Sequence, residues 1–399
     1  MDIATQLPTW INEHRDEIVS DLIDLVSQET PSDDKLLLSA GLAWIERWLA
    51  SRIGPPTNRR MVDGGKYGDT LVLGYEAAVR TDNWVTALCH YDTVWASGTL
   101  ASWPPNVDGD RVTAPGVFDM KGGVVQLVWA LKACTALGFA RPNLRLVLNG
   151  DEEIGSPASR GVIEEEVVRG TAVLVLEASS KGAVKTSRKG AGIFRVDVLG
   201  QEAHAGLDPE SGVSAIDEVS RIVMKLHAAA DLSQGTSVNV GTLHAGTRTN
   251  VKAGRATANV DVRVSSKAEA QRIEELFAEL KPHDPKAEIT VRGGWNRPVM
   301  QRSAATASLF ATATAAASEL GFALEETSVG GYSDGNFAAA LGLPVLDGLG
   351  AVGDGAHARH EWISIDGMLQ RTALTSAILA RLSALPPSGE SLGPLGLPL

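Results

Sequence analysis

Mostly apolar runs of strand length alternate with segments of helical periodicity in the first part of the chain. Leu144–Leu148 and Ala172–Leu176 are such runs, and the apolar residues at 124, 127, 128 and 131 have helical spacing. On this basis we expect helices at 8–53, 124–138 and 158–169, and strands at 70–75, 85–89, 144–148 and 172–176. The alternation predicts an α/β fold with a mainly parallel sheet covered by helices.

The middle of the chain has a different order of elements. The pattern predicts strand, helix, strand, strand, helix and strand at residues 193–199, 213–230, 237–243, 256–264, 269–281 and 287–292. This order is typical of a ferredoxin-like α+β fold. Helical patterns return at 304–320 and 366–385. We therefore expect residues 1–187 and 298–385 to form one α/β domain, 188–297 to form an inserted domain, and the Pro/Gly-rich residues 386–399 to be a disordered tail.

Composition narrows the class of protein. The 36 basic and 48 acidic residues give a net charge of −12, which argues against nucleic acid or an anionic membrane as the main partner. No run is long and apolar enough to span a bilayer, and the N-terminus lacks the pattern of a secretory signal. Only Cys89 and Cys134 occur, without paired spacing, so we expect no disulfide framework and a cytoplasmic location.

Potential metal ligands follow the predicted strands. His90 follows the strand at 85–89, Glu152 and Glu153 follow the strand at 144–148, and Glu177 follows the strand at 172–176. Sites in parallel sheets lie beyond the carboxyl ends of the strands. Of two adjacent carboxylates, one can hold a metal while the other takes a proton from water. Each residue also has an ordinary interpretation: a solvated loop, a strand-end histidine or a solvated strand end. Together they favour a metal site.

Several short motifs occur in a fixed order along the chain. They are His90-Tyr91-Asp92-Thr93-Val94, Gly116-Val117-Phe118-Asp119-Met120-Lys121-Gly122-Gly123, Asp151-Glu152-Glu153-Ile154-Gly155-Ser156, Leu176-Glu177, His204-Ala205-Gly206 and His357-Ala358-Arg359-His360-Glu361. The series resembles the co-catalytic zinc peptidase family of aminoacylase, acetylornithine deacetylase, succinyl-diaminopimelate desuccinylase and glutamate carboxypeptidase. The resemblance spans about residues 10–385, and its wording is most similar to the glutamate-carboxypeptidase branch.

The resemblance implies two Zn²⁺ ions per subunit, with Co²⁺ or Mn²⁺ as alternatives that accept similar ligands. By this resemblance Asp119 bridges the two ions, one ion is held by His90 and Glu177, and the other by Glu153 and His357. His357 is preferred to His360 because the family's histidine lies four residues before a glutamate, here Glu361.

The same resemblance assigns the supporting residues of the catalytic domain. Glu152 becomes the general base, and Asp92 is expected to hydrogen-bond the second ring nitrogen of His90. The peptide bond after the bridging aspartate is cis in the family, so we expect a cis bond between Asp119 and Met120. Asp334 and Ser333 are interpreted as turn residues rather than ligands.

In the family, the inserted domain serves as a dimerisation or lid domain. The resemblance therefore implies a homodimer in which His204 reaches across to the substrate carbonyl oxygen. Asn250 and Arg263 correspond to residues that bind the substrate carboxylate, and Arg263 lies on the polar face of its predicted strand. Arg297 is either a second carboxylate contact or a surface residue.

A glycine-rich loop completes the expected substrate site. Gly330 and Gly331 correspond to a loop that lets backbone amides approach the substrate. Tyr332 stands where the family usually has another small residue, and this departure leaves the substrate range open.

The expected activity is metal-dependent hydrolysis of the amide bond of an N-acyl amino acid or small peptide with a free carboxylate. A glutamate-carboxypeptidase-like enzyme and an N-acyl-amino-acid deacylase use the same residues, so both stay open. Carbamoyl-amino-acid hydrolases share His-x-Asp but not Asp119-Met120-Lys121-Gly122-Gly123. A non-catalytic binding protein of this fold is the alternative from another class, and the presence of all ligands and the base argues against it.

Overall fold

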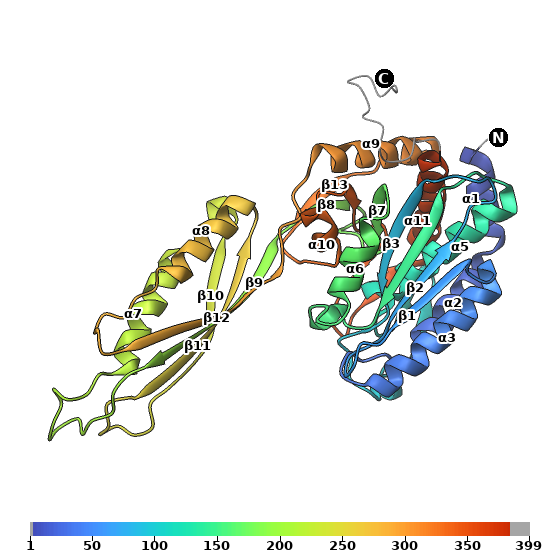
Figure 1. The fold of residues 1–399 in the computed structure, drawn as a ribbon. Coiled ribbons are helices and arrows are strands. Elements are labelled where there is room, and N and C mark those ends of the chain that lie inside the picture. The colour runs from blue at the N-terminus through green and yellow to red at the C-terminus, as the bar shows by residue number, and fades with distance from the viewer. Residues whose placement is uncertain (1–2, 384–399) are drawn as a thin grey trace. The chain divides into compact units, whose positions relative to one another are not determined.

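The computed structural model describes residues 3–383, so the tail expected at 386–399 lies outside the described range. The chain divides into two compact units, each of which can be followed in Figure 1. The first contains the chain up to Ser187, Arg302–Val329 and the chain from Ser333 onward. The second contains Arg188–Gln301 and Gly330–Tyr332. The domain boundaries expected at residues 187/188 and 297/298, and the independent folding of each domain, stay predictions.

The first unit is built on a six-stranded sheet with the strand order β1-β2-β6-β3-β7-β14. Its strands are β1 (Asn58–Val62), β2 (Thr70–Tyr75), β6 (Asn143–Asn149), β3 (Trp84–His90), β7 (Ala172–Val175) and β14 (Val345–Leu346). The neighbours β6, β3, β7 and β14 are parallel, whereas β2 is antiparallel to β1 and β6. The mainly parallel sheet is therefore confirmed. Edge strand β1 was not predicted, because its residues are mostly polar and exposed.

Helices cover both faces of this sheet. They are α1 (Ile3–Glu13), α2 (Arg15–Val26), α3 (Lys35–Ile53), α4 (Thr99–Ser102), α5 (Gly122–Leu137), α6 (Arg160–Val167), α9 (Ala304–Glu319), α10 (Gly335–Ala340) and α11 (Ile365–Leu382). Alternate strand residues such as Leu144, Leu146 and Leu148 share one core with α1, α2, α3, α5, α9 and α11. Helices α6 and α10 contact strands β6, β7 and β14 but contribute nothing to that core, which places them on the other face.

A small antiparallel sheet brings the loop after β15 beside the segment that follows β5. It contains β4 (Asn106–Asp108), β5 (Arg111–Thr113), β15 (Gly353–Asp354) and β16 (Trp362–Ser364), in the order β15-β16-β5-β4. Ile363 pairs with Val112, so the loop between β15 and β16 lies next to the turn that follows β5. The unit also has a two-stranded sheet of β8 (Val184–Arg188) and β13 (Glu326–Val329). Cys89 and Cys134 are buried free thiols, as expected.

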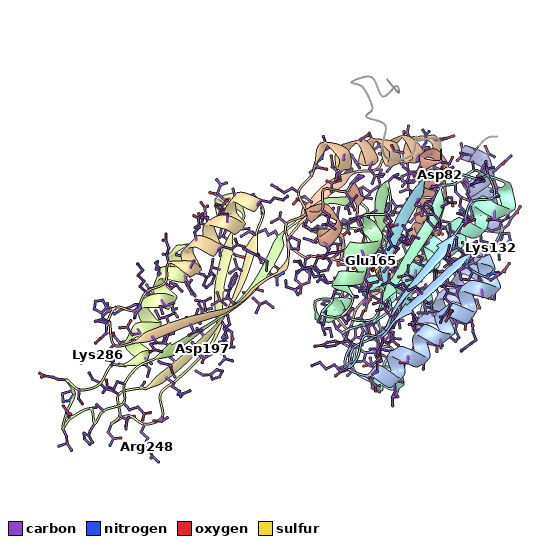
Figure 2. The ribbon with its side chains drawn as sticks, viewed as in Figure 1. Asp82, Lys132, Glu165, Asp197, Arg248 and Lys286 are labelled. Carbon is purple, nitrogen blue, oxygen red and sulfur yellow. The ribbon has the colours of Figure 1, made fainter. Side chains whose placement is uncertain are left out.

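The second unit has the expected ferredoxin-like order. Its elements are β9 (Gly190–Leu199), α7 (Ala215–Ala228), β10 (Ser237–Ala245), β11 (Arg255–Val264), α8 (Lys267–Ala278) and β12 (Glu288–Arg297). The antiparallel strand order is β10-β11-β9-β12. Val260 and Val262 of β11 pack with Val219 and Leu226 of α7 and with Phe277 of α8, so both helices cover one face of the sheet. In Figure 2, Asp197 lies on the sheet and Arg248 in the loop between β10 and β11. Within residues 3–383 no helix could cross a membrane.

Candidate active site

Three adjacent strands end at the same edge of the central sheet. β3 ends at His90, which pairs with Asn149 at the end of β6, and β7 ends at Val175 on the other side of β3. Because the three strands are parallel, the residues that follow them meet at this edge. The short segments with Asp92, Glu152 and Glu177 therefore come together, as the sequence predicts.

Five of the expected ligand residues form two groups that share one aspartate. In the first group, Nε2 of His90 lies 3.2 Å from Oδ1 of Asp119 and 3.3 Å from Oε1 of Glu177. In the second, Nε2 of His357 lies 3.3 Å from Oδ2 of Asp119 and 3.0 Å from Oε2 of Glu153. The two oxygens of Asp119 thus face different histidines. Among the described residues His360 belongs to neither group.

The donor types and their spacing fit a divalent metal ion in each group. Zinc binds imidazole nitrogen and carboxylate oxygen at about 2.0–2.2 Å, so tetrahedral ligands lie about 3.3–3.5 Å from one another. The four separations given above are 3.0–3.3 Å, close to that value. The ligand atoms of each group all lie within 4.8 Å of one another. Each group can therefore close around one cation.

The electrostatic field at the site also favours cations. Hydrogen bonds to Asp119 and Glu153 raise the pKa of His357 to about 11. Burial, together with the negative charge of Asp119, raises the pKa of Glu153 to about 7. Burial acts against the charged form of Asp119, yet hydrogen bonds from His357 and His90 hold its pKa well below the usual range. Clustered carboxylates stabilise positive charge on their neighbours, and a dication would be stabilised by the same field.

Asp92 lies next to the ring of His90 with both its main chain and its side chain. Nδ1 of His90 lies 3.0 Å from the backbone carbonyl oxygen of Asp92, whereas the nearer carboxylate oxygen is 3.5 Å away. The nearest acceptor is thus the main chain rather than the side chain. The Asp92 carboxylate accepts hydrogen bonds from the backbone N–H groups of Glu152 and Glu153 and from the Ser32 hydroxyl. It therefore fixes the segment that carries the two adjacent glutamates.

Glu152 and Glu153 diverge as expected for adjacent residues. They begin a single 3₁₀ turn, Glu152–Ile154, which is separated from the end of β6 by two residues. Glu153 contacts His357, whereas Glu152 belongs to neither ligand group of the described residues. Glu152 is 7% exposed, so its carboxylate is held in a largely buried place beside the ligands. The expected cis peptide bond between Asp119 and Met120 is confirmed.

Asp334 lies in a turn, as interpreted from the sequence, and it is also buried beside the segment with Glu152 and Glu153. Its carboxylate accepts hydrogen bonds from the Ser156 hydroxyl at 2.5 Å and from the Asn149 amide at 2.8 Å. These two residues flank the segment with Glu152 and Glu153. No local signal could have found this contact, because Ser156 and Asp334 are 178 residues apart in sequence.

The second unit brings His204 and Asn250 together. His204 forms a β-bridge with Val251, and the N–H of Ala205 donates to the carbonyl oxygen of Asn250 at 3.0 Å. The backbone N–H groups of Gly206 and Leu207 donate to Nδ1 of His204, at 3.2 and 3.1 Å. In a neutral imidazole Nε2 must then carry the proton. The exposed His204 therefore presents a hydrogen-bond donor.

Arg263 and Arg297 flank the central strand of the same unit. Both pair with Ala191 of β9, one from each side, so their side chains emerge on the same face. Their guanidinium carbons lie 4.9 and 5.3 Å from the centre of the Tyr332 ring. Arg297 is 0% exposed, so the surface role considered for it is wrong.

The expected glycine loop belongs to this cluster. Arg188 donates to the carbonyl oxygens of Gly331 and Tyr332, at 3.3 and 3.1 Å. These bonds tie the segment Gly330–Tyr332 to the start of the second unit, to which the segment itself belongs. The cluster thus offers two guanidinium groups close to one aromatic ring.

Known proteins resemble this chain over most of its length. The model of peptidase family M20/M25/M40 matches residues 88–381. Carboxypeptidase G2 of Pseudomonas sp. (strain RS-16) is 30% identical over 376 residues, 92% of this chain and 89% of that protein. Succinyl-diaminopimelate desuccinylase of Dechloromonas aromatica (strain RCB) is 28% identical over 316 residues, 73% of this chain and 82% of that protein. The crystal structure of aminopeptidase PepT from Bacillus cereus has a TM-score of 0.76 at 19% identity, over 92% of this chain and 98% of that one.

The family match spans both ligand groups and the segment with Glu152. The family match agrees with a site whose donor atoms suit divalent cations, with Glu152 next to the ligand Glu153 in sequence. The chain belongs to peptidase family M20/M25/M40 and is a metal-dependent hydrolase that acts on amide bonds.

Proposed function

We propose that this hydrolase cleaves the amide bond of an N-acyl amino acid or small peptide with a free carboxylate, with two Zn²⁺ ions per chain. The observation that carries the proposal is the sharing of Asp119 between two donor groups, with Glu152 beside them. The similarity to carboxypeptidase G2 over 92% of the chain favours a carboxypeptidase-like activity. A deacylase activity is the second candidate, because the desuccinylase is similar over 73% of the chain.

Bound metal ions at the donor groups would polarise the amide carbonyl and make a water molecule more acidic. Glu152 accepts a proton from the attacking water and later delivers it to the departing amine. Its neighbour Glu153 serves as a ligand, and the Asp92 carboxylate keeps both backbone amides in place. The division of labour is possible because consecutive side chains of a 3₁₀ turn point in different directions.

The residues of the second unit would bind the substrate rather than the metal. Nε2 of His204 donates a hydrogen bond to the carbonyl oxygen, where negative charge develops during attack. Arg263, supported by Arg297, pairs with the substrate carboxylate, because a planar guanidinium can donate two parallel hydrogen bonds to it. Asn250, beside His204, supplies a further polar contact.

A panel of N-acyl amino acids, dipeptides and their α-amides tests the proposal. We expect metal-dependent amine release from the acids and little from the amides, because the amides cannot pair with Arg263. Arg263→Lys should raise KM for the acids about 10–100-fold, since a charge-assisted hydrogen bond is lost. Arg255→Lys, on the same strand but exposed, is the matched control. Equal release from acids and amides would contradict carboxylate binding, and no release from any compound would favour a non-catalytic binding protein.

We also propose that the protein is a homodimer joined through the second unit. Apolar side chains are exposed on α7 and on the neighbouring edge strand β10, among them Met224 at 72%, Ile216 at 45% and Leu243 at 47%. Within the described residues β10 pairs with β11 alone. An unpaired edge beside exposed apolar residues is typical of a surface covered by a partner.

The dimer and the role of His204 can be tested together. Mixing inactive His204→Ala with inactive Glu152→Ala should restore about a quarter of wild-type activity, because half of the dimers are mixed and each has one complete site. Subunit exchange is checked with differently tagged chains by native mass spectrometry. Mixed dimers without activity would show that His204 does not act across subunits.

A further inference from the structure

Glu361 is a buried carboxylate that takes part in neither ligand group. It is 0% exposed and lies four residues after His357, in the loop between β15 and β16. One of its oxygens accepts hydrogen bonds from the backbone N–H groups of Phe118 and Asp119, at 2.8 and 3.1 Å. The other accepts from the N–H of Gly116 at 2.9 Å and from Nε1 of Trp95 at 3.1 Å.

These four bonds join three segments that carry proposed metal ligands. Trp95 lies five residues after His90, the backbone donors belong to the turn with Asp119, and Glu361 itself lies in the loop of His357. Charge-assisted hydrogen bonds are stronger than neutral ones, and a buried carboxylate is costly without them. Glu361 therefore fixes the backbone of Asp119 with respect to the loop of His357.

We infer that Glu361 is a positioning residue that holds Asp119 and His357 at the separation at which both donor groups can close around a cation. The inference rests on the proposed metal sites. It predicts a specific effect, because Asp119 belongs to both groups. A shift of the Asp119 backbone should lower the metal affinity of both sites. A general loss of folding stability should not lower the metal affinity of the protein that remains folded.

Glu361→Gln is the most direct variant. Each carboxylate oxygen of Glu361 accepts from two N–H donors. In glutamine one of these oxygens is replaced by an NH₂ group, which cannot accept and would face two N–H donors. The segments around Glu361 must then move, or two of the four hydrogen bonds are lost. We expect the affinity for Zn²⁺ at both sites to fall about 10–100-fold, the usual effect of changing a group that orients a metal ligand.

Glu166→Gln is the matched control. Glu166 is also a buried glutamate, at 2% exposure, but its partners are the guanidinium groups of Arg60, Arg145 and Arg169. Both variants should lower the melting temperature of the metal-free protein. Only Glu361→Gln should lower the affinity for Zn²⁺, measured by competition with a chromophoric chelator, together with the number of ions retained.

Trp95→Phe keeps the inference testable if Glu361→Gln fails to fold. It removes one donor and keeps an aromatic ring, so we expect a loss of affinity of about 2–10-fold. Unchanged affinity in both variants, with two ions bound by the wild type, would overturn the inference and leave the proposed function intact. Weakening confined to one site would overturn it too, because Asp119 is shared. A wild-type protein that binds no metal would overturn the proposed function and this inference together.

Discussion

Glu152→Gln is expected to lower kcat about 10²–10⁴-fold while both metal sites stay filled, because a general base contributes that much to the rate. Glutamine keeps the shape of the side chain but cannot accept the proton of the attacking water. Glu152 belongs to neither ligand group in the described part of the chain, so metal affinity should hardly change. KM should also stay close to its wild-type value, because Glu152 acts mainly on the transition state.

The measurement is steady-state turnover with a good substrate, together with metal content after gel filtration. Glu165→Gln is a suitable control, since Glu165 lies on α6, where its carboxylate pairs with Arg60 and Arg169 (Figure 2). Full activity of Glu152→Gln would exclude it as the base. Loss of bound metal in this variant would instead make Glu152 a ligand.

Asp119→Ala should have an even larger effect, because one side chain serves both donor groups. We expect both ions to be lost, with affinity lowered more than about 100-fold, which is the upper end for residues that only orient a ligand. Turnover should fall to the background rate. Glu177→Ala provides the contrast, since Glu177 occurs only in the group with His90 and should weaken one site.

The two variants are compared by titration of the metal-free protein with Zn²⁺ and by activity at saturating metal. Asp108→Ala is the control, because Asp108 is an exposed aspartate on β4. Equal effects of Asp119→Ala and Glu177→Ala on one site only would show that Asp119 is not shared.

The sequence by itself was enough for the buried strands of the central sheet and for most of the helices, because these depend on local spacing. Mostly apolar runs of strand length predicted β3 and β6, and apolar residues at helical spacing predicted α5. The order of such patterns in the middle of the chain predicted the ferredoxin-like fold. Strand ends followed by His90, Glu153 and Glu177 predicted which residues meet, because parallel strands end at one edge. The family resemblance also favoured His357 over His360, through the position of Glu361.

Only the tertiary structure decided how these residues are held. The carboxylate of Asp334 binds Ser156 across 178 residues of sequence, and Glu361 binds the backbone of Asp119 across 242. Arg263 and Arg297 meet at Tyr332 because β11 and β12 pair with opposite sides of β9. Likewise, the carboxylate of Asp92 lies closer to the backbone nitrogen of Glu152 than to the ring of His90. Such contacts leave no periodic trace in the sequence, because hydrogen bonds between distant segments depend on how the whole chain packs.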